Sequence, residues 1–242
     1  MKGVIIAGGL GTRLYPLTFA TNKHLLPIFD RPMIFYPIQA LVKAGIKEVM
    51  IVVSGPHAGH FISILKNGKE FGLKHLEFGY QNGADKGIAD ALAVAEDFSD
   101  GGPITVVLGD NTTDADIGPA VKSFKEGATI FLKKVPNPKC FGVPVFDKRN
   151  PKKIIAIEEK PKKPKSSYAV TGLYIYDNKV FDYIRKCKPS SRGQLEITDV
   201  NNFYIKAGNI HWEELKGFWS DAGSFESLFR SSQYWASKKG VR

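Results

Sequence analysis

The sequence predicts an α/β fold built on a doubly wound, mostly parallel sheet. Strand and helix patterns alternate through the first half of the chain, and the predicted strands at 4–7 and 49–53 are apolar throughout. Continuous apolar strands are typical of parallel sheets that helices cover on both faces. From residue 128 strand patterns dominate, which indicates a smaller β-rich part or an extension of the same sheet. We therefore expect a single domain over residues 1–242, with parts at 1–127 and 128–242.

The elements expected in the first half alternate in type along the chain. Strands are predicted at 4–7, 49–53, 75–80 and 103–108, and helices at 32–44, 58–66, 87–97 and 117–126. The first of these helices has apolar residues at helical spacing, and Gly45 is placed to end it. The second half is predicted to hold strands at 128–135, 142–147, 153–158, 168–176 and 210–214, with helices at 179–187, 199–207 and 224–238.

The composition is that of an ordinary globular protein. The chain has 242 residues, of which 43% are hydrophobic and 24% charged, enough for a full core. No apolar run approaches the roughly 20 residues that span a bilayer, and the N-terminus shows no signal-peptide pattern. Cys140 and Cys187 are the only cysteines and are far apart in sequence, which suits a reduced cytosol. We expect a cytoplasmic protein without a membrane partner.

The net charge of +10 does not by itself indicate a nucleic-acid partner. The lysines are thinly spread and are densest at 148–165, in a proline-rich stretch. No run of basic residues alternates with aromatic ones, as a nucleic-acid-binding surface would lead us to expect. An anionic substrate, steered by the positive field, accounts for part of the charge, and a lysine-rich solvated surface for the rest. We expect no nucleic-acid partner.

A glycine-rich turn follows the first predicted strand and is the strongest local signal in the chain. Glycines there expose backbone N–H groups and let an anion approach closely. A dinucleotide fingerprint would need a glycine where Leu14 stands, and a Walker loop would need a closing Gly-Lys-Ser/Thr, which is missing. We interpret the turn as a cradle for a nucleoside triphosphate. Its candidate residues are Gly8, Gly9, Gly11, Thr12 and Arg13, with Lys23 adding further positive charge.

The same stretch reads G-G-x-G-T-R-L-x-P-x-T followed by K-x-L-L-P-I. It resembles the signature of the sugar-phosphate nucleotidyltransferases, and most closely that of glucose-1-phosphate thymidylyltransferases. The resemblance implies a Rossmann-like nucleotidyltransferase fold in which the glycine loop wraps a triphosphate while Arg13 and Lys23 neutralise it. The part at 1–127 would then bind the nucleotide, and the part at 128–242 the sugar. His24 departs from the family, which often has Gln there.

Gln81 follows the strand predicted at 75–80 and is a candidate for reading a pyrimidine. Its amide offers both a donor and an acceptor, as the edge of thymine or uracil requires. Gly87, at the start of the next helix, would let its backbone reach the base. The segment resembles the family's Q…D-G-L-A-Q-A, with one more loop residue and with Asp90 in place of Gln.

Two aspartates are candidates for holding Mg²⁺. Asp110 follows the strand predicted at 103–108, and ligands bind at the carboxyl ends of strands in α/β sheets. Mg²⁺ is bound through one or two carboxylates together with substrate phosphates. L-G-D-N matches the family motif whose Asp binds metal, and F-W-S-D-A-G resembles W-x-D-x-G, which implies that Asp221 is the second carboxylate. From the residues alone, Asp221 or Ser224 could equally cap the following helix.

Candidate sugar-binding residues lie in three motifs of the second half. Phe141-Gly142-Val143 resembles the family's Y-G-V. The segment Y-A-V-T-G-L-Y at 168–174 matches the family's motif of the same residues almost outright. The resemblance implies that Gly142, Glu159 and Val170 meet the sugar and that Lys160 meets its phosphate. The chemistry agrees, because a carboxylate accepts bonds from neighbouring hydroxyls and a lysine supplies a compact charge. Glu196, in R-G-Q-L-E-I-T-D, either contacts the sugar edge or offsets a helix dipole.

The resemblance implies an enzyme that joins dTTP and glucose 1-phosphate to give dTDP-glucose and pyrophosphate, with Mg²⁺. Arg13, Lys23, Asp110 and Lys160 would be its catalytic residues. A uridylyltransferase using UTP is the alternative, because Gln81 would read both pyrimidines. A catalytically silent sugar-nucleotide-binding subunit should lose charged site residues, and here they are present. Known family members carry further helices after the one predicted at 224–238, so we expect a monomer or a homodimer.

Overall fold

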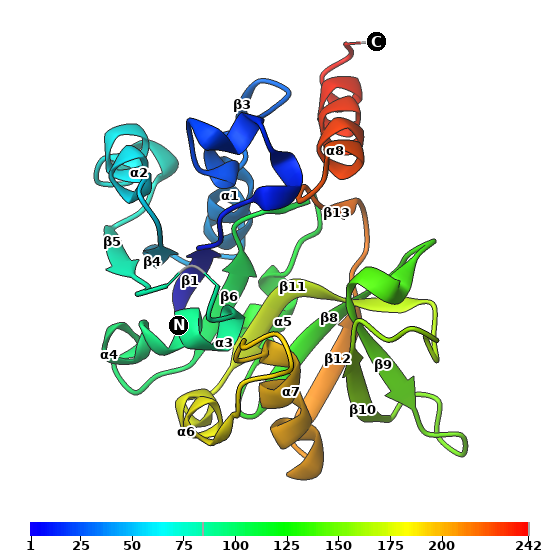
Figure 1. Ribbon diagram of the computed structural model, residues 1–242. Coiled ribbons are helices and arrows are strands. Elements are labelled where there is room, and N and C mark those ends of the chain that lie inside the picture. The colour runs from blue at the N-terminus through cyan, green and yellow to red at the C-terminus, as the bar shows by residue number, and fades with distance from the viewer. Residues whose placement is uncertain (84, 242) are drawn as a thin grey trace.

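The computed structural model describes residues 1–83 and 85–241, and a seven-stranded sheet runs through it (Figure 1). The strand order is β12-β8-β11-β6-β1-β4-β5. Four neighbouring strands are parallel: β5 (His75–Tyr80), β4 (Glu48–Val53), β1 (Lys2–Ala7) and β6 (Ile104–Leu108). β11 (Tyr168–Tyr176) runs antiparallel to β6 and to β8 (Ala128–Lys134), and β12 (Ile210–Glu214) is parallel to β8. The predicted doubly wound, mostly parallel sheet is confirmed.

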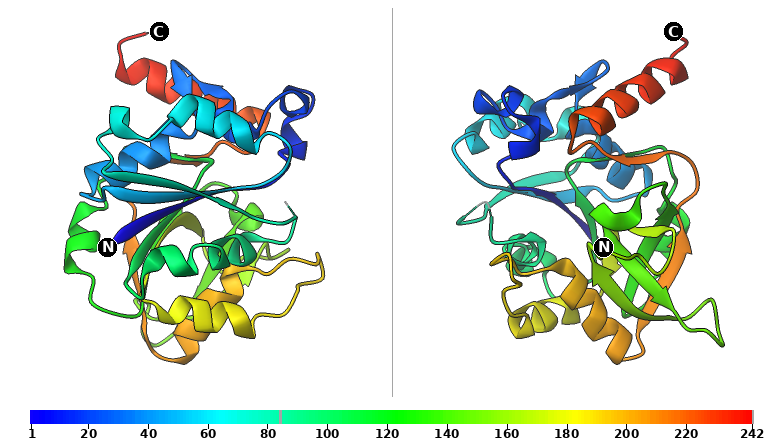
Figure 2. Two further views of the ribbon diagram at one scale, coloured as in Figure 1. Left: turned by 90° about the vertical axis from the view of Figure 1, so that its left-hand side faces the viewer. Right: turned by 45° about the vertical axis from the view of Figure 1, so that its right-hand side comes forward.

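Helices cover both faces of this sheet (Figure 2). One face packs against α1 (Phe35–Lys43), α2 (Ala58–Leu65) and α5 (Gly118–Ser123). The other packs against α3 (Ile88–Ala93), α4 (Glu96–Ser99), α6 (Lys179–Lys186) and α7 (Ile197–Lys206). Within β1, Ile5 faces the first set of helices and Val4 and Ile6 face the second. This alternation of side chains explains why the strand is apolar at every position.

The chain reverses its direction of winding between β1 and β6. It proceeds from β1 outward to β4 and β5, and then returns to place β6 on the other side of β1. In such sheets, ligands bind in the crevice at the carboxyl ends of the two diverging strands. Gly109 donates a backbone hydrogen bond to Ile6 at 2.8 Å, so the segments after the two strands start side by side.

The second part of the chain is mainly an extension of the same sheet, because β8, β11 and β12 belong to it. β9 (Gly142–Phe146) and β10 (Ile154–Glu159) form a separate antiparallel ribbon to one side (Figure 1). Two shorter antiparallel pairs are β7 (Asn111–Thr113) with β13 (Trp219–Asp221), and β2 (Pro27–Ile28) with β3 (Arg31–Pro32). Single 3₁₀ turns occur at Thr12–Leu14, Leu17–Phe19, Lys23–Leu25, Lys69–Phe71 and Pro138–Cys140.

Most predicted elements lie within a few residues of their observed bounds, but one helix is divided. The helix predicted at 87–97 is two helices, α3 and α4. Val94 and Ala95 bond back to Ala91 and Leu92, three residues earlier, which tightens the last turn of α3 and ends it. The helix predicted at 32–44 begins only at Phe35, because residues 31–32 form β3.

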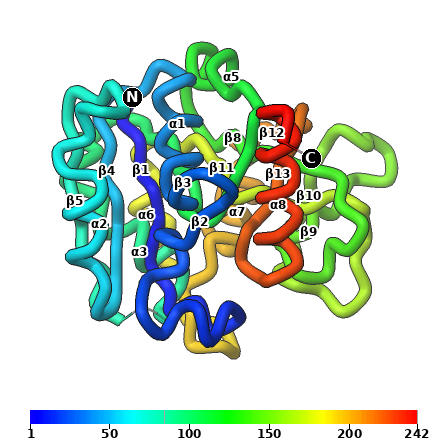
Figure 3. Tube along the Cα trace, turned by 90° about the horizontal axis from the view of Figure 1, so that it is seen from above, coloured from blue at the N-terminus to red at the C-terminus, as the bar shows by residue number. Residues whose placement is uncertain are grey.

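The last helix, α8 (Phe225–Lys238), lies beside β2 and β13 (Figure 3). Ser224 caps it: its hydroxyl accepts a hydrogen bond from the Ser227 amide at 3.3 Å. Of the two capping candidates, the structure uses Ser224, which leaves the Asp221 side chain free for another role. None of the helices in the described residues is both long and apolar enough to cross a membrane.

Candidate functional site

Two adjoining cavities open at the crevice between β1 and β6. The first has a volume of about 180 Å³ and the second of about 170 Å³, and Ile88, Glu159 and Lys160 line both. The first also contains the predicted residues Arg13, Asp110, Asp221, Gly142 and Val170. The second also contains Gly8, Gly9, Gln81 and Gly87. Gly11, Thr12 and Lys23 are not among the residues that line either cavity in the described chain.

The pairing of β7 with β13 brings the two predicted metal ligands together. Asp110 immediately precedes β7, and Asp221 ends β13 opposite Asn111. The Ala222 amide donates to the Asp110 carbonyl at 2.8 Å, so the two aspartates sit on neighbouring backbone segments. Both carboxylates contribute to the first cavity although they are far apart in sequence.

An ion pair links Asp110 to the segment after the glycine loop. Lys23 Nζ lies 2.5 Å from Asp110 Oδ2, and the two side chains are only 14% and 13% exposed. Burial alone would raise the pKa of Asp110, but the charge of Lys23 and hydrogen bonds from Lys23 and Asn111 hold that pKa well below its usual range. The nearby imidazole of His24 has its pKa lowered to about 3, by burial and then by Lys23, so it is uncharged at neutral pH.

Asp221 experiences the opposite effect. Burial, followed by the negative charge of Asp110, raises the pKa of Asp221 to about 6, although Arg13 and Lys23 oppose the shift. Residues 1–83 and 85–241 contain no group of three or more His, Cys, Asp and Glu side chains suited to a metal. The pair of carboxylates nevertheless fits a hard cation such as Mg²⁺, which takes one or two carboxylates and completes its shell with water and substrate phosphates. A divalent charge here would also relieve the repulsion between Asp110 and Asp221.

The glycine loop is shaped by its neighbours as much as by its own sequence. Gly9 and Gly11 have φ values of 97° and 64°, which favour glycine. The Gly9 amide donates to Ser54 Oγ at 3.1 Å and is therefore engaged within the protein. Gly11 packs against Lys23, since a Cβ added to it would lie 3.0 Å from Lys23 Cβ. Gly11 therefore supports Lys23 instead of lining the cavity.

Arg13 reaches from the glycine loop toward the carboxylates. A Cβ added to Gly223 would lie 2.7 Å from Arg13 Nη2 and 3.6 Å from Asp221 Oδ2. The guanidinium therefore lies over Gly223, next to Asp221, at the wall of the first cavity. Its position would let it meet an anion that also approaches the carboxylate pair.

Gln81 is buried at the end of β5 and forms one wall of the second cavity. Its Nε2 donates to the Gly87 carbonyl at 3.1 Å and to Asp90 Oδ2 at 2.8 Å. The expectation that this amide offers a bound base both a donor and an acceptor is therefore wrong for this conformation, because both amide hydrogens are used inside the protein. Oε1 is the atom left to interact with a ligand.

The other end of the first cavity lies on the β9–β10 ribbon. Gly142 and Glu159 are directly paired across the two strands, and Val170 lines the same cavity. Thr198 donates to Glu159 Oε2 at 2.6 Å, which fixes the carboxylate. Lys160 has φ of 44°, a left-handed conformation that costs a non-glycine residue about 1–3 kcal/mol and is often found at functional sites.

Several residues of the site escaped sequence reasoning. Asn111 Oδ1 accepts from the Gly172 amide at 3.0 Å and from Trp219 Nε1 at 2.6 Å, while its Nδ2 donates to Asp110 at 2.9 Å. Arg192 bridges Glu159 and Glu196 at 3.2 and 2.8 Å. Glu196 is therefore engaged with Arg192. The L-G-D-N and R-G-Q-L-E-I-T-D motifs contained Asn111 and Arg192, but nothing in sequence showed which partners they meet.

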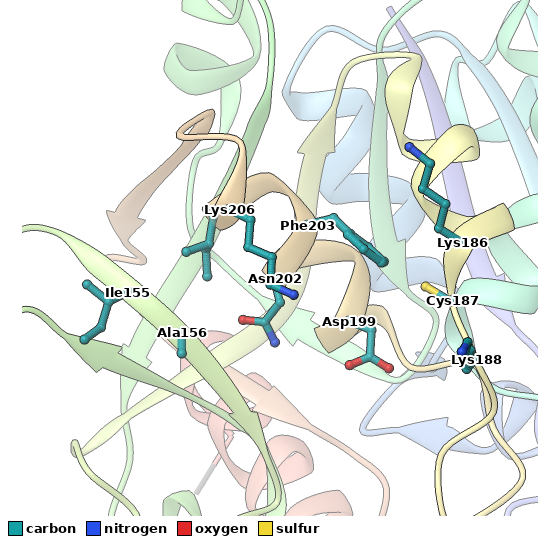
Figure 4. Close-up of a pocket in the computed structure, with 10 residues that line it drawn as sticks. Ile155, Ala156, Lys186, Cys187, Lys188, Asp199, Asn202, Phe203 and Lys206 are labelled. Atoms are coloured by element: carbon teal, nitrogen blue, oxygen red, sulfur yellow. The ribbon is translucent and has the colours of Figure 1, made fainter.

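A larger hollow, of about 520 Å³, lies elsewhere, between β10, α6 and α7 (Figure 4). Asp199, Asn202 and Phe203 of α7 line it, with lysines from α6 and α7. Thr198 and Asn201, on the same helix, line the first cavity instead. The hollow contains none of the glycine-loop residues and neither metal-ligand candidate, so we do not assign the site to it.

The fold and this site together define an α/β nucleotide-binding protein, with its ligand crevice at the reversal of winding. Comparison with known proteins agrees: the model of the nucleotidyl transferase family matches residues 2–238. The chain belongs to this family, and within it to the group of the glucose-1-phosphate thymidylyltransferases. The resemblance noted from the motifs is confirmed.

Individual relatives show how similar the chain is to known members of this group. It is 43% identical to glucose-1-phosphate thymidylyltransferase of Xanthomonas campestris, over 96% of this chain and 80% of that protein. Identity to the Neisseria gonorrhoeae enzyme of the same name is 40%, covering 97% of this chain and 82% of that protein. A crystal structure from Bacillus anthracis, assigned to the same activity and in complex with sucrose, superposes with a TM-score of 0.90 at 48% identity, covering 97% and 94% of the two chains. A UDP-glucose pyrophosphorylase structure shares the fold, with a TM-score of 0.83 at 24% identity.

Replacing Asp221 with Asn is expected to stabilise the metal-free protein more at pH 8 than at pH 4. The folded-state pKa of about 6 lies above the reference value of 3.8, so between them the folded chain keeps a proton that the unfolded chain has lost. Wild-type stability therefore falls as pH rises through this window, by up to about 3 kcal/mol, and the variant lacks that loss. Urea unfolding with a chelator measures it, with the exposed Asp97→Asn variant as control. An equal effect of the Asp221 change at both pH values would contradict the account.

Proposed function

We propose that the protein transfers a thymidylyl group from dTTP to glucose 1-phosphate, giving dTDP-glucose and pyrophosphate. One observation carries the proposal: two cavities that share Glu159 and Lys160 bring Arg13 and the two aspartates, the Gly8–Gly9 turn with Gln81, and the β9–β10 ribbon to one place. A two-substrate transferase needs both reactants held in one continuous space. The name shared by the relatives at 38–43% identity gives the same reaction.

The nucleotide would lie along the glycine loop, with its base against Gln81 and Gly87. Gly8 and Gly9 line that cavity, and a Cβ at Gly8 would come within 2.8 Å of Gln81 Oε1, so the bare backbone there leaves room for the Gln81 amide. Arg13 would meet the phosphates that leave as pyrophosphate. Lys23, which is ion-paired with Asp110, would offset negative charge near the triphosphate.

The sugar phosphate would enter from the β9–β10 side. Glu159, fixed by Thr198, would accept hydrogen bonds from neighbouring sugar hydroxyls, with Gly142 and Val170 against the ring. Lys160 lies on both cavities, where the two substrates would meet, and would bind the sugar's phosphate. This assigns Lys160 the task of bringing the attacking phosphate to the nucleotide.

The reaction would be a single displacement. An oxygen of glucose 1-phosphate forms a bond to the α-phosphorus, and the bond from that phosphorus to the bridging oxygen breaks, its electron pair leaving with pyrophosphate. The attacking oxygen is already anionic, so no general base is required. The barrier lies in alignment and in repulsion between anions, which positioned cations and hydrogen-bond donors lower.

We propose that Asp110 and Asp221 hold Mg²⁺. When bound, the cation would supply positive charge to the reacting phosphate. The chain's own contribution is to present two carboxylates at one wall of the cavity, with Asn111 holding the orientation of Asp110.

UTP is the alternative nucleotide. Thymine and uracil share the N3–H group that Gln81 Oε1 would accept from, and differ only in the C5 methyl group. Pyrophosphate release with Mg²⁺, across dTTP, UTP, dCTP, ATP and GTP and several hexose 1-phosphates, tests the proposal. We expect the highest kcat/KM for dTTP with glucose 1-phosphate. A higher value for UTP would favour the uridylyltransferase, and no release from any pair would overturn the enzyme assignment.

Arg13→Ala and Asp110→Asn are each expected to lower kcat/KM by roughly a hundred- to a thousand-fold. Loss of one preorganised electrostatic contact to a transition state typically costs about 2.7–4 kcal/mol. The control is Arg149→Ala, which removes an exposed arginine between β9 and β10 and should leave turnover unchanged. Turnover like that of the wild type in either site variant would refute its role.

A further inference from the structure

The side-chain amide of Gln81 is held in one orientation. Its Nε2 donates to the Gly87 carbonyl at 3.1 Å and to Asp90 Oδ2 at 2.8 Å. Each partner is an acceptor, and neither can donate a hydrogen bond. If the amide turned over, its oxygen would face two acceptors and lose both bonds. Asp90 and the Gly87 carbonyl therefore keep the nitrogen inward.

The oxygen of the same amide lies against the glycine loop, at a residue that lines the second cavity. A Cβ added to Gly8 would lie 2.8 Å from Oε1, which places this atom against the bare backbone of the loop. Gln81 lines the cavity together with Gly8 and Gly9. No hydrogen bond to Oε1 occurs within residues 1–83 and 85–241. The cavity thus presents an acceptor to a bound base.

We propose that Asp90 is a positioning residue that makes Gln81 an acceptor and thereby selects the base. The inference rests on the proposed function, in which Gln81 meets the Watson–Crick edge of the nucleotide. Thymine and uracil carry a hydrogen on N3 that Oε1 accepts, whereas cytosine has a bare N3, so that two acceptors, N3 and Oε1, would face each other. Asp90 therefore disfavours cytidine nucleotides through Gln81.

The chemistry of an aspartate suits this role. An ionised carboxylate only accepts hydrogen bonds, and a bond to it is stronger than one to a neutral group. Asp90 lies in the first turn of α3, is partly exposed, and accepts a hydrogen bond from Gln81. A carboxylate in the first turn also interacts favourably with the helix dipole and so stabilises the helix. The experiment must therefore separate this structural role from the positioning role.

The experiment compares dTTP with dCTP in four proteins: wild type, Asp90→Asn, Asp90→Ala and Asp90→Lys. Both kcat/KM with glucose 1-phosphate and the calorimetric Kd of each nucleotide are measured. Asn retains an acceptor for Gln81 Nε2 but loses the charge that favours the helix. We expect the preference of Asp90→Asn for dTTP over dCTP, taken as the ratio of their kcat/KM values, to stay within about threefold of the wild-type ratio.

Asp90→Ala should lower that ratio by about tenfold, the order of one charge-assisted hydrogen bond. Asp90→Lys places a donor beside Gln81, draws Oε1 toward itself and should lower the ratio further. Since residue 90 is partly exposed, a lysine has room, and this variant also tests the proposal if Asp90→Ala does not fold.

An unchanged ratio in Asp90→Ala or Asp90→Lys overturns the inference. An equal fall of the ratio in Asp90→Asn and Asp90→Ala also overturns it, because the loss would then come from the charge at the start of the helix. If the wild type discriminates in Kd as described but releases no pyrophosphate, the proposed function fails while the inference about Asp90 is supported.

Discussion

The site depends on the ion pair between Lys23 and Asp110. Asp110 and Asp221 are brought together by β7 and β13 in a partly buried place, where burial and then the negative charge of Asp110 raise the pKa of Asp221. Lys23 neutralises Asp110 at 2.5 Å and at the same time ties the segment after the glycine loop to the end of β6. A buried carboxylate without such a partner would be strongly unfavourable. The same contact therefore allows the carboxylate pair to exist and fixes the loop beside it.

Winding of the sheet sets where this contact forms. Because β1 and β6 are neighbours at the reversal of winding, the glycine loop and Asp110 emerge at one edge. The extension of the sheet through β11 and β8 carries the β9–β10 ribbon to the same crevice, where Glu159 and Lys160 face both cavities. One architecture thus brings residues from both halves of the chain to each of the two cavities.

Much of this arrangement could be predicted from the sequence. The features that could not be predicted were missed for one common reason. Apolar runs identified β1 and β4, and the motifs pointed to Arg13, Asp110 and Lys160, because each signal lies within one short stretch. The strands β7 and β13 have only three residues each and no apolar pattern, so they were missed. Two of the three hydrogen bonds of Asn111 join segments more than 60 residues apart, which no local pattern shows. The orientation of Gln81 likewise depends on a contact that the pattern does not show, its hydrogen bond to Asp90 in the first turn of α3.

A crystal structure of the protein with dTDP-glucose and Mg²⁺ would test the central claim most directly. The account predicts the thymine N3 within hydrogen-bond distance of Gln81 Oε1 and the glucose between Gly142 and Glu159. It also predicts the cation on Asp110 and Asp221. Product bound instead in the hollow between β10, α6 and α7, with the two shared cavities empty, would contradict the account.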